Sequence, residues 1–152
     1  MDKGTVLNKL NEIQRWEWTG VAQYMQYHFL VRGPWRQVFS AEFKEGAEES
    51  LTHASKIGEK IVALGGTPTL ERAEVKQTIQ LEEMLQNSLA FEEGAVKLYT
   101  EAIKLADEWG NKALVVLLED ILLDEQEGAE AWAKILATTD TSATLKSASK
   151  VG

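Results

Sequence analysis

Apolar side chains recur every three or four positions along four long stretches of this chain. That spacing places them on one face of an α-helix and predicts helices over residues 5–32, 36–64, about 75–107 and 111–137. The positions that define the four faces are Leu7, Leu10, Ile13, Val21, Tyr24 and Val31, then Phe39, Phe43, Ile57, Ile61 and Leu64, then Leu85, Leu89, Val96, Tyr99 and Ile103, and last Leu114, Leu117, Leu118, Ile121, Trp132 and Ile135. Few runs alternate with the period of a β-strand, so we expect an all-α fold.

Residues that interrupt helices separate the four stretches. They lie at 33–34, 65–68 and 110–111, and each group contains glycine with proline or asparagine. The first and third turns are tight, which predicts two antiparallel helix hairpins. The second connection is long enough to cross along the bundle, although the sequence does not require it. We therefore expect one four-helix bundle at residues 1–137 and a polar tail at 138–152, which is either irregular or one weak helical turn.

Composition narrows the class of protein. The chain has 152 residues, of which 44% are hydrophobic and 26% charged, as in an ordinary globular domain. It contains no cysteine, which excludes disulfides and thiolate metal sites. The net charge of −8 disfavours binding to nucleic-acid phosphates and anionic lipid. Residues 1–4 lack the apolar run of a secretory signal, and no apolar stretch is long enough to span a bilayer. We expect a cytoplasmic protein that binds neither nucleic acid nor membrane.

Polar residues interrupt the apolar faces at one level of the predicted bundle. Glu17 precedes the first interhelical turn by 16 residues, and His53 follows it by 20. Glu92 precedes the third turn by 18 residues, and Glu125 follows it by 15. Because each residue advances an α-helix by about 1.5 Å, these four side chains are expected at similar heights in the bundle interior.

Three carboxylates and one imidazole in an apolar interior need compensation. An unpaired buried carboxylate costs several kcal/mol, and no lysine or arginine lies on these faces at this level. Either the glutamates bind a cation, or they are protonated with raised pKa values. Oxygen and imidazole ligands suit iron, manganese or zinc. Convergence from all four helices favours a metal site.

Several short stretches then resemble one family. They are Leu-Asn-Lys-Leu at 7–10, Gln-Tyr at 23–24 after Glu17, His-Ala at 53–54 followed by the turn at 64–68, Glu-Glu-Met-Leu at 82–85, Leu-Ala-Phe-Glu at 89–92 and Ile-Leu-Leu-Asp-Glu at 121–125. Over about residues 5–136 the chain resembles the ferritin-like di-iron carboxylate proteins, and among them the bacterioferritins. The resemblance implies a ferritin-like antiparallel four-helix bundle.

The resemblance also implies roles for the polar residues. Glu17 and Glu92 match the family's two lone glutamate ligands, His53 matches the histidine of the second helix, and Glu125 matches the bridging glutamate of the fourth. Tyr24 matches a tyrosine that hydrogen-bonds beside the site. The implied metal ligands are therefore Glu17, His53, Glu92 and Glu125, and the implied metal is iron, one or two ions per subunit.

Three positions depart from the family pattern. Ser50 stands where the second helix has a bridging glutamate, and Gly128 stands where the fourth has a histidine. Leu51 stands where the bacterioferritins have their haem-ligating methionine, so haem is not expected. Four neighbouring carboxylates are candidates to compensate for the lost ligands: Glu45, Glu49, Glu127 and Glu130.

The leading hypothesis is an iron-binding, bacterioferritin-like protein that oxidises and stores Fe(II), with ferroxidase activity weakened by Ser50 and Gly128. The alternative is a non-catalytic ferritin-like subunit with a degenerate or mononuclear site, for iron or for zinc or manganese. The resemblance implies a homodimer through the first two helices and leaves a 24-subunit shell open, because the tail is a poor fifth helix.

Overall fold

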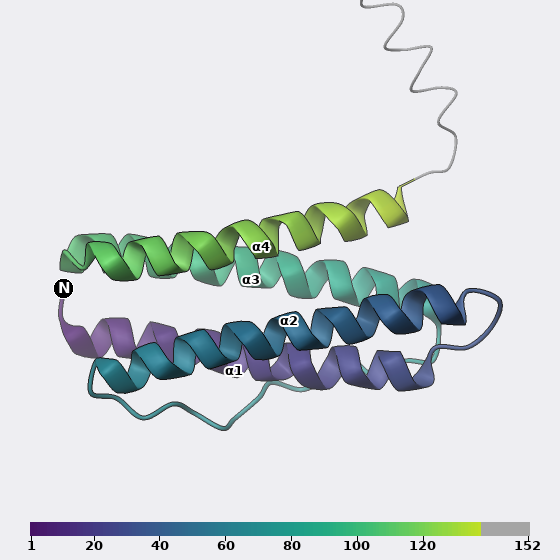
Figure 1. Ribbon diagram of the computed structural model, residues 1–152, viewed down its shortest axis with the longest axis horizontal. Helices are drawn as coiled ribbons and strands as arrows, with labels where there is room; N and C mark the ends of the chain where they lie inside the picture. Colours follow the sequence, from purple (N-terminus) through teal and green to yellow (C-terminus); the bar gives the residue numbers. More distant parts are fainter. Residues whose placement is uncertain (138–152) are drawn as a thin grey trace, which may run out of the picture.

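Four long helices form the computed structural model, which describes residues 1–137. They are α1 (Lys3–Leu30), α2 (Arg36–Ala63), α3 (Leu81–Trp109) and α4 (Lys112–Leu136). Figure 1 shows two hairpins, α1 with α2 and α3 with α4, stacked along their lengths. The predicted all-α four-helix bundle is confirmed. The expectations for the tail at 138–152 lie outside the described residues.

Local signals in the sequence set the helix ends. Asp2 accepts a hydrogen bond from the Thr5 amide at the start of α1, and the Asn111 side chain accepts one from the Leu114 amide at the start of α4. Gly110 ends α3 with φ 83°, a left-handed conformation that favours glycine. Gly110 and Asn111 form the tight turn of the second hairpin, and Gly33, with φ 99°, lies in the tight turn of the first.

The third helix begins later than expected. The prediction placed its start near Val75, but α3 begins at Leu81. The chain before it runs along α1, and three of its backbone amides donate to α1 side chains: Thr69 to Asn11 at 2.8 Å, Ala73 to Thr19 at 2.8 Å and Lys76 to Gln23 at 3.1 Å. Because these amides are bonded to α1, an extended crossover replaces the predicted helical turn.

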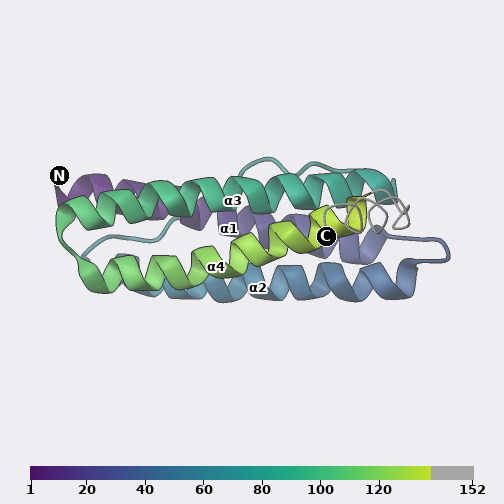
Figure 2. The same cartoon turned by 90° about the horizontal axis from the view of Figure 1, so that it is seen from above.

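The crossover sets the direction of the second hairpin. It returns along the outside of the bundle, so α3 starts at the end where α1 finishes (Figures 1 and 2). As a result α3 runs antiparallel to α1. The close helix pairs are α1 with α2, α3 with α4, and α1 with α3. The connection that the sequence left open therefore does cross the bundle.

The core consists of two apolar clusters with a polar level between them. One cluster includes Leu10, Ile57 and Leu118, and the other includes Phe43 and Trp132. Some predicted core positions are wrong. Ile135 is 43% exposed, while Leu7 and Val21 are only half-buried. Neighbours on the same helix, Val6 and Tyr27, are buried in the core of α1 instead. None of the helices in residues 1–137 is long and apolar enough to cross a membrane.

Candidate metal centre

Three predicted ligands meet in the middle of the bundle. Glu17 from α1, His53 from α2 and Glu125 from α4 each present one donor atom, and these atoms lie within 4.8 Å of one another. All three side chains are buried. Within the described residues this is the one such group of three or more acidic or imidazole side chains. It is called the Glu17–His53–Glu125 cluster below.

His53 has a carboxylate at each ring nitrogen. On the inner side Nδ1 lies 2.8 Å from Glu125 Oε1 and 3.8 Å from Glu17 Oε1. On the outer side Nε2 lies 3.1 Å from Oδ2 of Asp124, whose side chain is 47% exposed. Burial lowers the pKa of His53, but the hydrogen bonds and charges of Glu125 and Asp124 outweigh it and hold that pKa above its ordinary value.

Glu17 is completely buried, and only one of its two carboxyl oxygens has a hydrogen-bond partner among the described residues. Tyr99 donates a hydrogen bond of 3.1 Å to its Oε1. Its other oxygen, Oε2, has no hydrogen-bond partner among the described residues. Burial first, and then the charge of Glu125, raise the pKa of Glu17 well above its ordinary value. The raised pKa favours the protonated carboxyl in the metal-free bundle, and Oε2 is left without a partner among the described residues.

Glu92 lies at the same level but does not join the cluster. Its Oε1 accepts a 2.7 Å hydrogen bond from Tyr24, and the Tyr24 hydroxyl in turn accepts one of 3.1 Å from the Trp132 indole. Its Oε2 has no partner among the described residues. Burial and the neighbouring Glu125 carboxyl raise the pKa of Glu92 to about 10. The structure thus brings together three of the four predicted ligands, with Glu92 beside them in a hydrogen bond to Tyr24.

Gly128 and Ser50 shape the space around the cluster. A Cβ added at Gly128 would lie 3.1 Å from the Glu92 carboxyl carbon and 3.3 Å from both its oxygens. The Glu92 carboxyl therefore occupies space that a larger side chain at 128 would need. Ser50 is buried against Gly20, where an added Cβ would lie 2.5 Å from the Ser50 hydroxyl oxygen. Neither position supplies a carboxylate or an imidazole.

The four neighbouring carboxylates that the sequence offered as compensating ligands do not reach the cluster. Glu45, Glu49, Glu127 and Glu130 are all exposed, and none belongs to the cluster. Among these four, Glu49 interacts electrostatically with the cluster. Its pKa is raised by partial burial and by the charges of Glu125 and Asp124, with His53 acting in the opposite direction.

Sequence reasoning missed three residues that support the site. Asp124 directly precedes Glu125, and the sequence analysis gave it no role. Tyr99 and Trp132 were interpreted as plain core residues, whereas they donate hydrogen bonds to Glu17 and Tyr24. A signal was present for Tyr99: it follows Glu92 by seven residues, as Tyr24 follows Glu17. Two helical turns separate each pair, which places both tyrosines on the site face.

Comparison with known proteins identifies the family. The family model described as Ferritin-like domain matches residues 7–142. The chain therefore belongs to the ferritin-like family, and the predicted fold and family are confirmed. The functional prediction of an iron-binding ferritin-like protein is confirmed at this family level.

Individual relatives agree with this assignment. The chain is 32% identical to a bacterioferritin of Rhodobacter capsulatus over 123 residues, covering 80% of this chain and 76% of that protein. It is 27% identical over 125 residues to a nutrient stress-induced DNA-binding protein of Nostoc sp., covering 76% of this chain and 68% of that one. A solved ferritin-like, diiron-carboxylate protein from Bacillus anthracis superposes with a TM-score of 0.87 at 31% identity, over 90% of this chain and 100% of that chain.

The donor set could hold a metal ion. The cluster offers two carboxylates and one imidazole, with an unpartnered buried oxygen on Glu17. Ser50 and Gly128 add no further donor, and the Glu92 carboxyl lies beside Gly128. Oxygen and nitrogen donors of this kind suit iron, manganese or zinc.

Proposed function

We propose that this chain binds iron at a single-ion site formed by Glu17, His53 and Glu125. The observation that supports this most is the meeting of three donor atoms within 4.8 Å in a buried core, where no lysine or arginine of residues 1–137 neutralises the carboxylates. Membership of the ferritin-like family makes iron the expected metal. The mixed donors also fit zinc and manganese, which the experiment below includes as competitors.

The surrounding residues have distinct roles in this proposal. Glu17 and Glu125 would provide negative oxygen ligands, and His53 would provide a nitrogen ligand through Nδ1 while its Nε2 donates to Asp124. Tyr99 orients Glu17 through its hydrogen bond. Such outer hydrogen bonds fix the tautomer and the orientation of metal ligands. Glu92 retains its proton beside the site and is the nearest reserve oxygen ligand, so its predicted role as a fourth ligand stays a proposal.

Bound iron would supply positive charge and a one-electron redox couple. The protein contributes a water-poor site whose donors are already in place. A complete di-iron centre uses two ions together, and Ser50 and Gly128 remove ligands that such a centre would need. We therefore propose iron binding as the main activity and expect Fe(II) oxidation to be slow. Storage of oxidised iron would follow only in a closed shell of subunits.

We also propose that the chain forms a homodimer through α1 and α2. Several exposed large apolar side chains lie on these helices and their turn: Phe29, Trp35, Val38, Leu51 and Val62. Such residues favour burial against another protein surface. Leu51 offers no haem ligand, so the proposed dimer carries no haem. A cytoplasmic location and the absence of nucleic-acid and membrane binding remain part of this proposal.

Metal content after anaerobic loading with Fe(II) tests the site. Wild-type protein should bind about one iron per chain, and Glu125→Gln should bind none. Glu127→Gln is the matched control, because it removes a carboxylate from an exposed neighbour on the same helix. Addition of zinc or manganese in equal amount then ranks the metals. No bound iron in the wild type would refute the proposal, and two irons lost together in Glu125→Gln would refute a single-ion site.

A further inference from the structure

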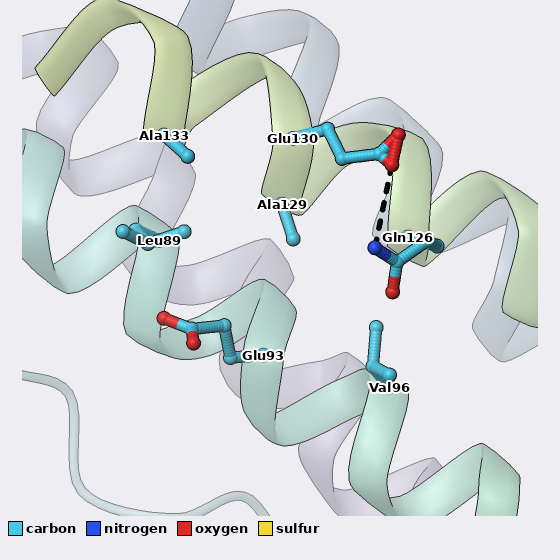
Figure 3. Close-up of a pocket in the computed structure, with 7 residues that line it drawn as sticks. All are labelled: Leu89, Glu93, Val96, Gln126, Ala129, Glu130 and Ala133. Carbon is cyan, nitrogen blue, oxygen red and sulfur yellow. Dashed lines mark hydrogen bonds between the residues drawn. The ribbon is translucent and has the colours of Figure 1, made fainter. Parts of the chain in front are cut away.

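A groove on the outer side of α3 and α4 has no assigned role. Figure 3 shows one half of it, where Leu89 and Val96 from α3 face Ala129 and Ala133 from α4. A second hollow continues from Val96 and Gln126 toward Leu122 and Leu123. The two hollows have volumes of about 340 and 390 Å³ and share Val96 and Gln126. They are adjacent and are together called the α3/α4 groove below.

The α3/α4 groove combines an apolar floor with charges of one sign. Its floor is made of leucine, valine and alanine side chains. The charged residues that line it are Glu93, Glu119 and Glu130, and no lysine or arginine of the described chain lines it. Gln126 donates a hydrogen bond of 3.3 Å to Glu130 along the α4 side of the groove. A matching occupant would carry apolar side chains together with positive charges.

The sequence after α4 has that character. Residues 138–152 contain two lysines, Lys146 and Lys150, and one acid, Asp140, in a chain whose net charge is −8. Leu145 directly precedes the first lysine, and Val151 directly follows the second. Each cation is therefore next to an apolar side chain. The tail thus combines apolar side chains with positive charges, which complements the apolar and negatively charged α3/α4 groove.

The tail also has the right starting point and length. Helix α4 ends at Leu136, only three residues after the groove residue Ala133. Leu122, toward the far end of the groove, lies 14 residues back along α4, or about 21 Å at a rise of about 1.5 Å per residue. Fifteen extended residues span up to about 50 Å. That is more than twice the length of the groove, so the tail reaches along the whole groove of its own chain without full extension.

We propose that residues 138–152 bind in the α3/α4 groove of the same chain, with Leu145 on the apolar floor and Lys146 and Lys150 at the groove carboxylates. The tail covers apolar surface that α3 and α4 leave open. Because the tail is tethered at Ala137, its effective concentration at the groove reaches the millimolar range, so weak contacts suffice. The metal centre is not required for this interaction.

Disulfide trapping tests the proposal in the full chain, which has no native cysteine. Ser147→Cys is combined either with Gln126→Cys, which lines the groove, or with Glu127→Cys, its exposed neighbour outside the groove lining. A disulfide requires Cα atoms within about 7 Å, so its rate of formation reports docking. In dilute protein with a mild oxidant, the Gln126→Cys pair should close at least about tenfold faster than the Glu127→Cys pair.

Charge reversal provides the second test. Adding Lys146→Glu and Lys150→Glu should reduce the Gln126→Cys rate to that of the Glu127→Cys control, because the groove carboxylates then repel the tail. Equal closure rates for the two original pairs would overturn the proposal. Disulfides that form only between chains would also overturn it, and would show that a second copy occupies the groove.

Discussion

Tyr99 donates a hydrogen bond to Glu17 across the bundle, and Tyr24 donates one to Glu92 in the opposite direction. Each tyrosine lies seven residues after the glutamate of its own hairpin and bonds to the glutamate of the other hairpin. The two hairpins therefore contribute equivalent pairs to one polar level. This exchange holds both buried carboxyls at the level of His53 and Glu125.

The Tyr99 hydroxyl should matter for iron as well as for stability. Tyr99→Phe leaves Glu17 without its hydrogen-bond donor in a fully buried position, so we expect a loss of about 1–2 kcal/mol in the free energy of unfolding. Iron affinity should fall because Glu17 is no longer oriented. Urea denaturation and iron titration measure the two effects.

Tyr27→Phe is the control for this prediction. The Tyr27 hydroxyl bonds to the Lys76 backbone oxygen, away from the metal centre. Its loss should lower stability while leaving iron affinity unchanged. If both variants reduce iron affinity equally, the effect of Tyr99 is general destabilisation and the assigned role is wrong.

The stability of the metal-free protein should fall as pH rises. The pKa of Glu92 is raised to about 10 in the folded state by burial and by Glu125, against an ordinary value of 4.5. Protonated Glu92 therefore makes its full contribution to the free energy of unfolding below pH 4.5. This contribution is lost progressively as pH rises toward 10. The raised pKa values of Glu17 and His53 likewise make the free energy of unfolding fall as pH rises.

Glu92→Gln tests the contribution of Glu92 directly. The amide keeps an acceptor for Tyr24 and cannot ionise. Between pH 7 and 9 its free energy of unfolding should fall less steeply than that of the wild type, by up to about 1.4 kcal/mol per pH unit. Urea denaturation with a metal chelator at several pH values provides the comparison. Parallel pH profiles would show that Glu92 does not hold a proton in the folded protein.

The position of the Glu92 carboxyl should leave room only for glycine at position 128. In the wild type, Gly128→Ala places a Cβ 3.1 Å from the Glu92 carboxyl carbon, so we expect destabilisation of about 1–3 kcal/mol. In a Glu92→Ala background the same change should stabilise by about 1 kcal/mol, because alanine is the better helix former. A double-mutant cycle by urea denaturation measures the reversal of sign. The same effect in both backgrounds would exclude a clash with Glu92.

Asp124 should set the orientation and the charge of His53. Asp124→Asn removes the carboxylate at Nε2, so the pKa of His53 should fall and iron affinity should drop about 10- to 100-fold. NMR titration of the imidazole and iron binding measure the two changes. Asp120→Asn, an exposed change one turn earlier on α4, is the control. An unchanged His53 titration in Asp124→Asn would contradict the role.

Much of the fold could be predicted because the apolar faces and the turn residues agree. The start of α3 could not. Val75 and Ile79 have helical spacing, but three backbone amides between 69 and 76 are bonded to α1 side chains that only the folded bundle brings near. Long-range hydrogen bonds of this kind leave no local signal in the sequence.

The candidate site was predictable to a similar degree. Helical spacing placed Glu17, His53 and Glu125 on facing surfaces, and the structure brings them together. The direction of the Glu92 carboxyl depends on the space beside Gly128, which spacing alone does not reveal. Asp124 was missed because its contact with His53 comes from the edge of α4 and not from its inner face.

The position of bound iron tests the central proposal most directly. Crystals of the Fe(II)-loaded protein, measured at the iron absorption edge, locate each ion by its anomalous scattering. The proposal predicts one peak among Glu17, His53 and Glu125 in each chain. Two peaks per chain, or a single peak between Glu92 and Gly128, would contradict it.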